Sequence, residues 1–182
     1  AARYNRMAAA YYITAQGVPF IHAGEEMLRS KPTEDAEGNF VFDHNSYSSG
    51  DDVNSFKWAM LQDDMVAASY EYYKGLIAFR KAHPALRMTN QAEILASMEV
   101  LETGSNNVIA ILNKGGNGED VQILTVINPG DNARFTLPEG EPQPEPEPVQ
   151  ESEPEPPVGT VSAPSITVAG VAAGSSTVVI EI

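Results

Sequence analysis

Two pairs of adjacent carboxylates are the residues whose types first suggest catalysis. Glu25 and Glu26 follow a short apolar run, and Asp51 and Asp52 precede a short helical segment. Neighbouring side chains of an extended segment point in opposite directions, so Glu25 and Glu26 should diverge. Either both are orienting or solvated acids, or one of them, Glu25, helps shape the floor of a pocket by hydrogen bonding. Asp51 either caps the helix or contacts hydroxyl groups of a ligand. Neither pair predicts a catalytic centre.

Amide and phenol side chains beside these carboxylates are better candidates for binding. Asn45, Tyr47 and Asn54 carry the amides and hydroxyls that orient neutral sugars through hydrogen bonds, while aromatic rings cover apolar sugar faces. The alternative is that they only pin a loop. Trp58 could serve as a sugar platform, although a lone tryptophan just before a turn is more often buried packing.

Metal ligation has little support in the sequence. The histidines show neither the cysteine partners nor the paired spacing of a zinc site: His22, His44 and His83. The segment Asp35-Ala36-Glu37-Gly38-Asn39 offers oxygen ligands for calcium, but its glycine is misplaced for the twelve-residue calcium loop, and a hairpin turn is favoured. We therefore predict no metal and no cofactor.

Charge and composition limit the partners. The chain has 182 residues, a formal net charge of -14 and a pI near 4.4, so it would be repelled by nucleic acids and anionic membrane surfaces. A neutral partner is expected. It has no cysteine, and no window approaches the roughly 18 to 20 apolar residues that a membrane span needs. The hydrophobic content of 42% is enough for a core.

Periodicity divides the chain into a helical first half and a strand-rich second half. Helices are predicted over residues 3–15 and 65–83; in the second, Asp63 or Asp64 is the cap and Val66, Tyr70, Tyr73, Ile77 and Arg80 mark one face. Between the helices, residues 18–22 read as a buried parallel-type strand, and residues 25–62 as a long ordered loop with an inserted hairpin.

The second half has the period of two that indicates an antiparallel sandwich. The predicted strands cover residues 93–101, 107–113, 121–127, 134–137, 165–169 and 176–182. Residues 140–158 alternate proline with glutamate or glutamine, so we predict an extended, flexible segment that interrupts the sandwich.

Three passages carry a family resemblance. Gly17-Val18-Pro19-Phe20-Ile21-His22-Ala23-Gly24-Glu25-Glu26 resembles the eighth barrel strand of the alpha-amylase superfamily. The passage from Asn45-Ser46-Tyr47 through Asp52-Val53-Asn54 to Trp58 is similar to the stretch that follows this strand in type I pullulanases. Tyr73-Lys74-Gly75-Leu76-Ile77-Ala78-Phe79-Arg80-Lys81-Ala82-His83-Pro84-Ala85-Leu86-Arg87 resembles the eighth barrel helix. Their order and spacing make the resemblance specific.

The resemblance implies an α+β fold: the remnant of the last α/β unit of a (β/α)₈ barrel, followed by an antiparallel β-sandwich. The expected division is 1–88 for the barrel end, with its last strand, cleft loop and last helix, and 89–182 for the sandwich. His22 should then face the barrel interior or a helix. An orphan barrel strand must pack under the second helix, pair with another copy of the chain, or leave strand form, so self-association is one expectation.

The resemblance also implies an enzyme that hydrolyses α-1,6-glucosidic linkages of pullulan, starch or glycogen with a retaining pair of carboxylates. In the family these acids precede the region matched here, so we expect a carboxy-terminal piece without catalytic residues, inactive alone, from a bacterial extracellular or cell-surface enzyme that binds α-glucan. The expected substrate contacts are Asn45, Tyr47, Asp51, Asn54 and Glu25. The alternative is a non-catalytic carbohydrate-binding or structural β-sandwich module, and another specificity within the superfamily also stays open.

Overall fold

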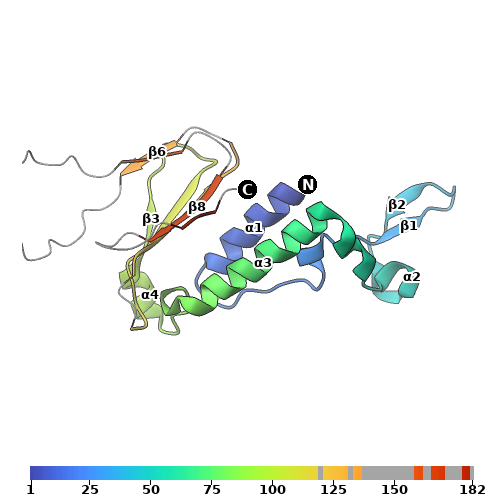
Figure 1. Cartoon of the computed structure of the whole chain (residues 1–182), viewed down its shortest axis with the longest axis horizontal. Helices are drawn as coiled ribbons and strands as arrows, with labels where there is room; N and C mark the ends of the chain where they lie inside the picture. The colour runs from blue at the N-terminus through green and yellow to red at the C-terminus, as the bar shows by residue number, and fades with distance from the viewer. Residues whose placement is uncertain (119–120, 131–132, 137–157, 162–164, 171–177, 181–182) are drawn as a thin grey trace, which may run out of the picture.

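A computed structural model describes residues 1–118, 121–130, 133–136, 158–161, 165–170 and 178–180. Two long helices lie side by side between a sheet at one end of the molecule and a projecting loop region at the other (Figure 1). The helices are α1 (Ala2–Thr14), α2 (Asp51–Asn54), α3 (Asp64–Ala82) and α4 (Gln91–Ser97). Short 3₁₀ turns are η1 (Glu25–Met27), η2 (Ser46–Ser48), η3 (Trp58–Gln62) and η4 (Pro84–Leu86).

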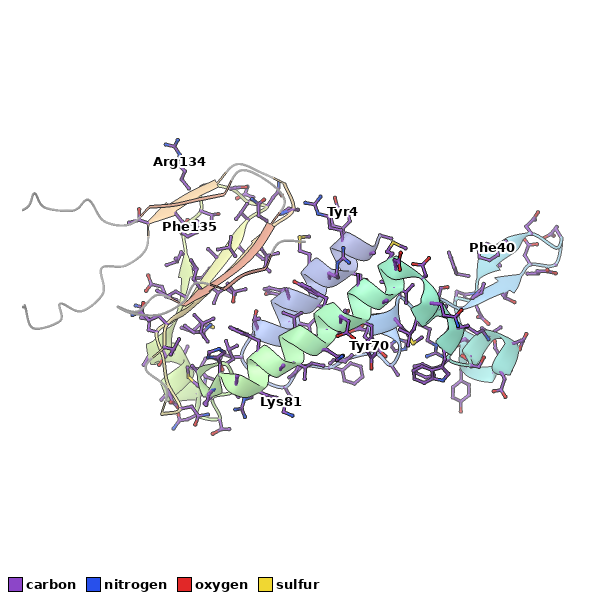
Figure 2. The ribbon with its side chains drawn as sticks, viewed as in Figure 1. Tyr4, Phe40, Tyr70, Lys81, Arg134 and Phe135 are labelled. Atoms are coloured by element: carbon purple, nitrogen blue, oxygen red, sulfur yellow. The ribbon has the colours of Figure 1, made fainter. Side chains whose placement is uncertain are left out.

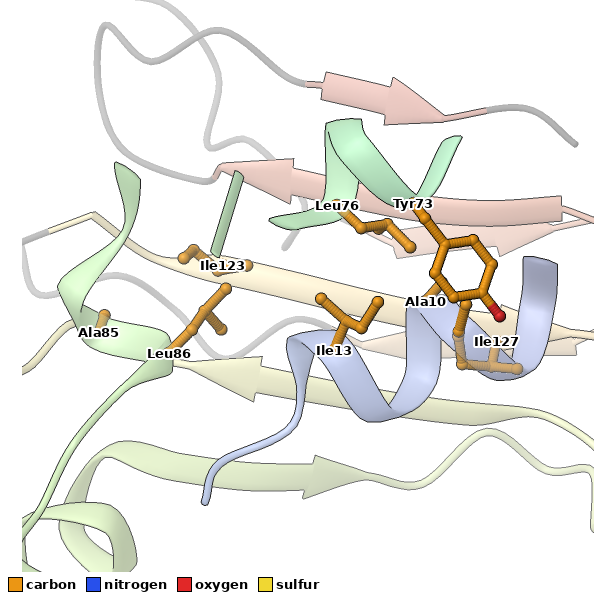
Figure 3. Packing of buried hydrophobic residues seen from close by; sticks show 9 residues of the cluster. Ala10, Ile13, Tyr73, Leu76, Ala85, Leu86, Ile123 and Ile127 are labelled. Carbon is orange, nitrogen blue, oxygen red and sulfur yellow. The ribbon is translucent and has the colours of Figure 1, made fainter. Parts of the chain in front are cut away.

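Helices α1 and α3 share one hydrophobic core with the sheet. Small residues on α1 allow a close approach, and Ile13 fills the space between the helices and the central strand (Figure 3). The buried members of this helix–sheet core are Ala9, Ala10, Ile13, Tyr73, Leu76, Ala85, Leu86, Ile123 and Ile127. The core therefore joins the two halves that differ in sequence periodicity.

Arg80 of α3 ties down the carboxyl end of α1. Its buried guanidinium donates hydrogen bonds to the carbonyl oxygens of Ile13 at 2.8 Å, Ala15 at 2.6 Å and Gly17 at 2.5 Å. Carbonyl oxygens at the carboxyl end of a helix have no amide donor from a following turn, so the Arg80 guanidinium supplies their hydrogen bonds. Its positive charge also interacts favourably with the negative end of the helix dipole. Burial lowers the pKa of Arg80.

The main sheet is antiparallel, with strand order β3-β4-β5-β8-β9. Its strands are β3 (Met98–Leu101), β4 (Ile109–Asn113), β5 (Ile123–Asn128), β8 (Ser165–Gly170) and β9 (Val178–Ile180). All six residues of β5 are buried: Ile123 and Ile127 face the helices, while Leu124 and Val126 face the opposite side. The final strand returns to the earlier sheet, as predicted.

A second, two-stranded sheet pairs β6 (Ala133–Thr136) with β7 (Val158–Val161). Phe135 of β6 packs with buried side chains of the main sheet: Leu101, Val108, Ala110, Leu112, Leu124 and Val126 (Figure 2). The main sheet is thus covered by helices on one face and by Phe135 on the other. The predicted flexible segment, 140–158, lies outside the described residues apart from Val158, which begins β7.

Two strand predictions in this part of the chain are wrong. Residues 18–22 are extended but pair with none of the described strands, and Val18 and Phe20 are 96% and 88% exposed rather than buried. Of the three outcomes expected for this segment, loss of strand form is the one observed. Residues 93–97 belong to α4, which begins after Asn90, whose side chain accepts a hydrogen bond from Ala92 N at 2.8 Å.

The predicted face of α3 is partly corrected. Its buried positions are Val66, Ser69, Tyr73, Leu76 and Arg80, whereas Tyr70 is half-buried and Ile77 is exposed. Asp63 is the N-cap of α3, because its carboxylate accepts hydrogen bonds from Met65 N and Val66 N. It is one of the two residues that the sequence predicted for this role. No helix in the described ranges is both long and apolar enough to cross a membrane.

Candidate functional site

The loop of residues 17–62 carries all five predicted site residues and projects from the helix pair (Figure 1). Its outermost part is the predicted hairpin, formed by β1 (Pro32–Glu34) and β2 (Phe40–Phe42). Asp35 closes the turn: its carboxylate accepts from Glu37 N at 3.0 Å, from Asn39 N at 2.8 Å and from Asn39 Nδ2 at 3.0 Å. Chiefly the Asn39 side chain lowers the pKa of Asp35. This geometry confirms the turn interpretation of the segment.

Asp43 and Lys31 position the next part of the loop from the base of the hairpin. The Asp43 carboxylate accepts from Asn45 N at 2.8 Å and from Ser49 Oγ at 2.5 Å, while Lys31 Nζ donates to Ser46 Oγ at 2.6 Å. The Ser49 hydrogen bond is the main cause of the lowered pKa of Asp43. Both interactions fix the turn η2 that carries Tyr47.

Asn54 acts within the loop. Its amide nitrogen donates to the carbonyl oxygens of Ser46 and Ser49, each at 2.8 Å, so both amide protons are used. The backbone carbonyl oxygen of Asn54 accepts a hydrogen bond from the Arg29 guanidinium. The same guanidinium also donates to the backbone oxygen of Ala23 at 3.0 Å. The two alternatives for Asn54 were ligand contact and loop pinning, and the observed contacts are those of pinning.

An aromatic stack follows α2. The rings of Phe56 and Trp58 lie 5.3 Å apart between centroids with an interplanar angle of 18°, and the Arg29 guanidinium carbon lies 4.6 Å from the Phe56 centroid. Trp58 is 63% exposed, so the expectation that it is buried packing is wrong. It sits in η3, outside the helix–sheet core, where Phe56 covers one of its faces.

The other predicted loop residues are available to solvent. Asn45 is exposed, and the Tyr47 side chain is 97% exposed. Asp51 lies in the first turn of α2, and the N-cap is Gly50 without a side-chain hydrogen bond, so the capping interpretation of Asp51 is wrong. Its carbonyl oxygen accepts from Lys57 Nζ at 3.2 Å. The structure thus brings four predicted residues, Asn45, Tyr47, Asp51 and Asn54, onto one loop.

Glu25 is separated from that group by its contacts with the helices. Its carboxylate accepts a hydrogen bond from the Tyr12 hydroxyl, and its carbonyl accepts from Asn5 Nδ2 at 3.4 Å. Burial, followed by the Glu25 hydrogen bond, raises the pKa of Tyr12. Glu26 instead accepts from Gly24 N at 3.0 Å, so the two carboxylates engage different partners, although both lie in the 3₁₀ turn η1 and not at the end of an extended segment as predicted.

An open cavity of about 400 Å³ lies at the base of the hairpin, lined by His22, Arg29, Ser30, Lys31, Phe42 and Asp43. Sequence reasoning placed His22 in the interior or against a helix, whereas it is exposed and lines this cavity.

The roles of Arg29 and Lys31 were missed because their partners are distant in sequence; Arg29 and Asn54 are 25 residues apart. Within the described residues, no group of three or more potential metal-ligating side chains is present.

Comparison with known proteins identifies the relatives. The chain is 31% identical over 171 residues to a pullulanase of Bacillus subtilis strain 168, an alignment that covers 86% of this chain. It superposes on the pullulanase from Bacillus acidopullulyticus with a TM-score of 0.70 at 28% identity, over 93% of this chain. The chain is a relative of the type I pullulanases. No protein-family model matches it.

The resemblance inferred from the motifs is confirmed, and a third comparison extends it. Type I pullulanase from B. subtilis, complexed with maltose, gives a TM-score of 0.69 at 26% identity, covering 94% of this chain and 24% of that one. The chain spans 22% of the B. subtilis pullulanase and 20% of the B. acidopullulyticus structure. Like these pullulanases, the chain combines helices with antiparallel sheet.

Proposed function

We propose that this chain supplies the carboxy-terminal part of a pullulanase-type debranching enzyme. Residues 1–88 would complete the catalytic barrel with its last strand, cleft loop and last helix, and residues 89–182 would form the β-sandwich domain. The observation that carries the proposal is the similarity to a pullulanase over 86% of the chain, which includes the projecting loop. Residues 18–22 form no strand in this chain, and Val18 and Phe20 are exposed; in the whole enzyme this segment would become the last barrel strand by pairing with neighbouring barrel strands.

The proposed reaction of the whole enzyme is hydrolysis of α-1,6-glucosidic linkages by a retaining mechanism. That mechanism needs two carboxyl groups about 5 to 5.5 Å apart that face one sugar. Glu25 and Glu26 do not offer such a pair, because Glu25 is engaged by Tyr12 and Glu26 by the backbone of Gly24. The nucleophile and the acid would therefore come from the rest of the enzyme, and this chain would bind and orient the glucan.

The loop offers neutral hydrogen-bonding groups for that task. Asn45 and Tyr47 are exposed, and their backbone is held in a turn by Asp43 and Asn54, so their side chains can meet a ligand without reordering the loop backbone. Asp51 lies in the first turn of α2, in the same loop. Two related structures contain sugar ligands: maltose in the B. subtilis pullulanase and maltotetraose in a mutant pullulanase from Paenibacillus barengoltzii. The proposal extends to a bacterial extracellular or cell-surface location, which follows from the resemblance alone.

A chimera tests the proposal. This chain replaces the matching segment of the B. subtilis pullulanase, and release of reducing sugar from pullulan is measured. We expect the chimera to hydrolyse pullulan and the isolated chain to release no sugar, because the catalytic carboxylates lie outside it. A folded but inactive chimera would contradict the proposal, and hydrolysis by the isolated chain, free of host enzyme, would overturn the division of roles.

A further inference from the structure

Trp58 is the most unusual exposed side chain of the loop. It is the single tryptophan of the sequence, and most of its surface meets solvent although one face of the indole lies against Phe56. Removing such a large apolar side chain from water is favourable, so its exposure forgoes the free energy that burial in the core would contribute. The indole ring nevertheless has a defined orientation, because it stacks on the ring of Phe56.

The support under the indole is built from several contacts. Phe56 stacks on Trp58, and Arg29 lies over the Phe56 ring. Arg29 is itself fixed by hydrogen bonds to Ala23 O and Asn54 O, and a Cβ atom added at Gly24 would come within 2.4 Å of its Cδ atom. A glycine is therefore needed where the arginine stem passes the backbone. A guanidinium on an aromatic face is attracted by the electrons of the ring, so Arg29 stabilises the position of Phe56.

The same contacts connect the support of Trp58 to the turn that carries Tyr47. Asn54, whose backbone oxygen accepts from Arg29, also donates from its amide to the backbone carbonyls of Ser46 and Ser49. The backbone on both sides of Tyr47 is thus tied to the residue that anchors Arg29. A loop backbone that is already fixed reduces the entropy cost of binding.

The surroundings of the ring favour a neutral ligand. The adjacent cation, Lys57, donates hydrogen bonds from its ammonium group to Asp51 O, Asp52 O and Ser55 Oγ. This ammonium group is therefore directed at oxygen atoms of the loop. The net charge of -14 disfavours an anionic ligand. A flat apolar ring face without a neighbouring unpaired cation is a surface that the apolar face of a glucose unit of an α-glucan matches.

The geometry points to Trp58 as a stacking platform for one sugar ring of a neutral α-glucan, with Phe56 and Arg29 as the positioning residues that hold it. The inference rests on the proposed function, because it takes the ligand class from there. It adds a contact residue to the loop, distinct from the amides and phenol predicted from the sequence.

Tryptophan fluorescence of the full 182-residue chain tests the platform directly, because Trp58 is the only emitter of its kind. With maltohexaose as the probe, we expect a saturable shift of emission and reduced quenching by acrylamide. The dissociation constant should agree with that from calorimetry. Trp58→Ala should weaken the calorimetric affinity about tenfold, which corresponds to about 1.4 kcal/mol. Trp58→Phe should restore part of it.

Tyr4→Ala is the matched control. It removes an aromatic side chain of nearly equal exposure, 62%, from α1, and it should leave the dissociation constant unchanged. Arg29→Lys keeps the charge but removes the planar group, so acrylamide quenching without glucan should rise and the affinity should fall several-fold, with unchanged melting of the helix–sheet core. A role of Arg29 in stability alone would lower the melting temperature without changing the quenching.

Other outcomes overturn the platform. Calorimetric binding of maltohexaose with unchanged Trp58 emission and unaltered affinity in Trp58→Ala would leave the loop as a glucan contact but remove Trp58 from it. Absence of both heat and emission change would also refute the platform, as would complete protection of Trp58 from acrylamide in the glucan-free chimera, where protein would cover the ring. Pullulan hydrolysis by the chimera judges the proposed function separately.

Discussion

The helix–sheet core and the loop of residues 17–62 are stabilised in different ways. The core buries large apolar side chains from α1, α3 and β5 in one cluster. In the loop, Met27 and Val53 are the buried hydrophobic residues among those described, while several other apolar side chains are exposed: Val18, Phe20, Phe40, Phe42, Tyr47 and Trp58. The loop conformation is specified mainly by polar side chains bonded to its own backbone.

This difference predicts unequal local stability. Full burial of a large apolar side chain contributes about 1.5 to 3 kcal/mol, whereas a typical hydrogen bond contributes about 0.5 to 1.5 kcal/mol net. The loop should therefore open at a lower free energy than the core. Because α1 belongs to the core, we expect hydrogen exchange to be slow in α1 and fast over residues 17–24.

The largest effect is expected from Leu76→Ala. This fully buried side chain lies at the centre of the core, so its removal leaves a cavity and should lower the free energy of unfolding by about 4 kcal/mol. Phe20→Ala removes a larger side chain from the loop and should change it by less than about 0.5 kcal/mol. Urea denaturation measures both. Equal losses would show that the loop segment is packed in solution.

Arg80→Ala should cost somewhat less, about 3 kcal/mol, because three carbonyl oxygens at the end of α1 lose their donors. The loss should appear as fast hydrogen exchange at the carboxyl end of α1. Lys81→Ala, at an exposed neighbouring position, serves as the control and should leave exchange unchanged. If both variants behave alike, the link between the helices is not made by this guanidinium.

Asp63→Ala should destabilise the chain by about 1 kcal/mol through loss of the α3 cap. Asp63→Asn retains an acceptor for Met65 N and Val66 N, so it should keep most of that free energy. Thermal melting followed by circular dichroism compares the two. A loss as large for asparagine as for alanine would assign the effect to charge instead of to the cap.

The smallest effect is expected in the loop itself and concerns pH. The pKa of Asp43 is lowered chiefly by the Ser49 hydroxyl, so its stabilising contribution is present above the ordinary carboxyl pKa and is lost as pH falls through the lowered value. Carbonyl-carbon NMR titration should show this depression, and Ser49→Ala should raise the pKa toward its ordinary value. An unchanged titration in that variant would mean that Ser49 does not hold the loop.

The sequence predicted elements whose signals are local. The α3 cap, the hairpin around Asp35 and most strands of the second half follow from residues close together in the chain. Residues 93–97 were predicted wrongly because a short stretch fits both periods, and the Asn90 cap decides for helix. Residues 18–22 were predicted as a strand from composition, but a strand also needs a partner, and a single sequence segment does not show where that partner lies.

The site was predicted in outline only. The loop and its exposed Asn45 and Tyr47 were anticipated, and the choice between ligand contact and loop pinning for Asn54 depended on partners at Ser46 and Ser49. Arg29 was not anticipated, because its contacts with Asn54 and Phe56 join residues far apart in sequence. Exposure of Trp58 was likewise decided by three-dimensional packing, which its residue type does not reveal.

The pairing of β6 with β7 has a consequence for changes in chain length. Thr136 lies opposite Val158, so the two points that a connection from β6 to β7 must join are held together by one strand pair. Closing a connection between such fixed ends costs free energy that grows only logarithmically, about 0.6 kcal/mol for each doubling of its length. Evolution or engineering can therefore lengthen, shorten or replace this connection, even with a whole domain, while the register of the strands that flank it stays the same.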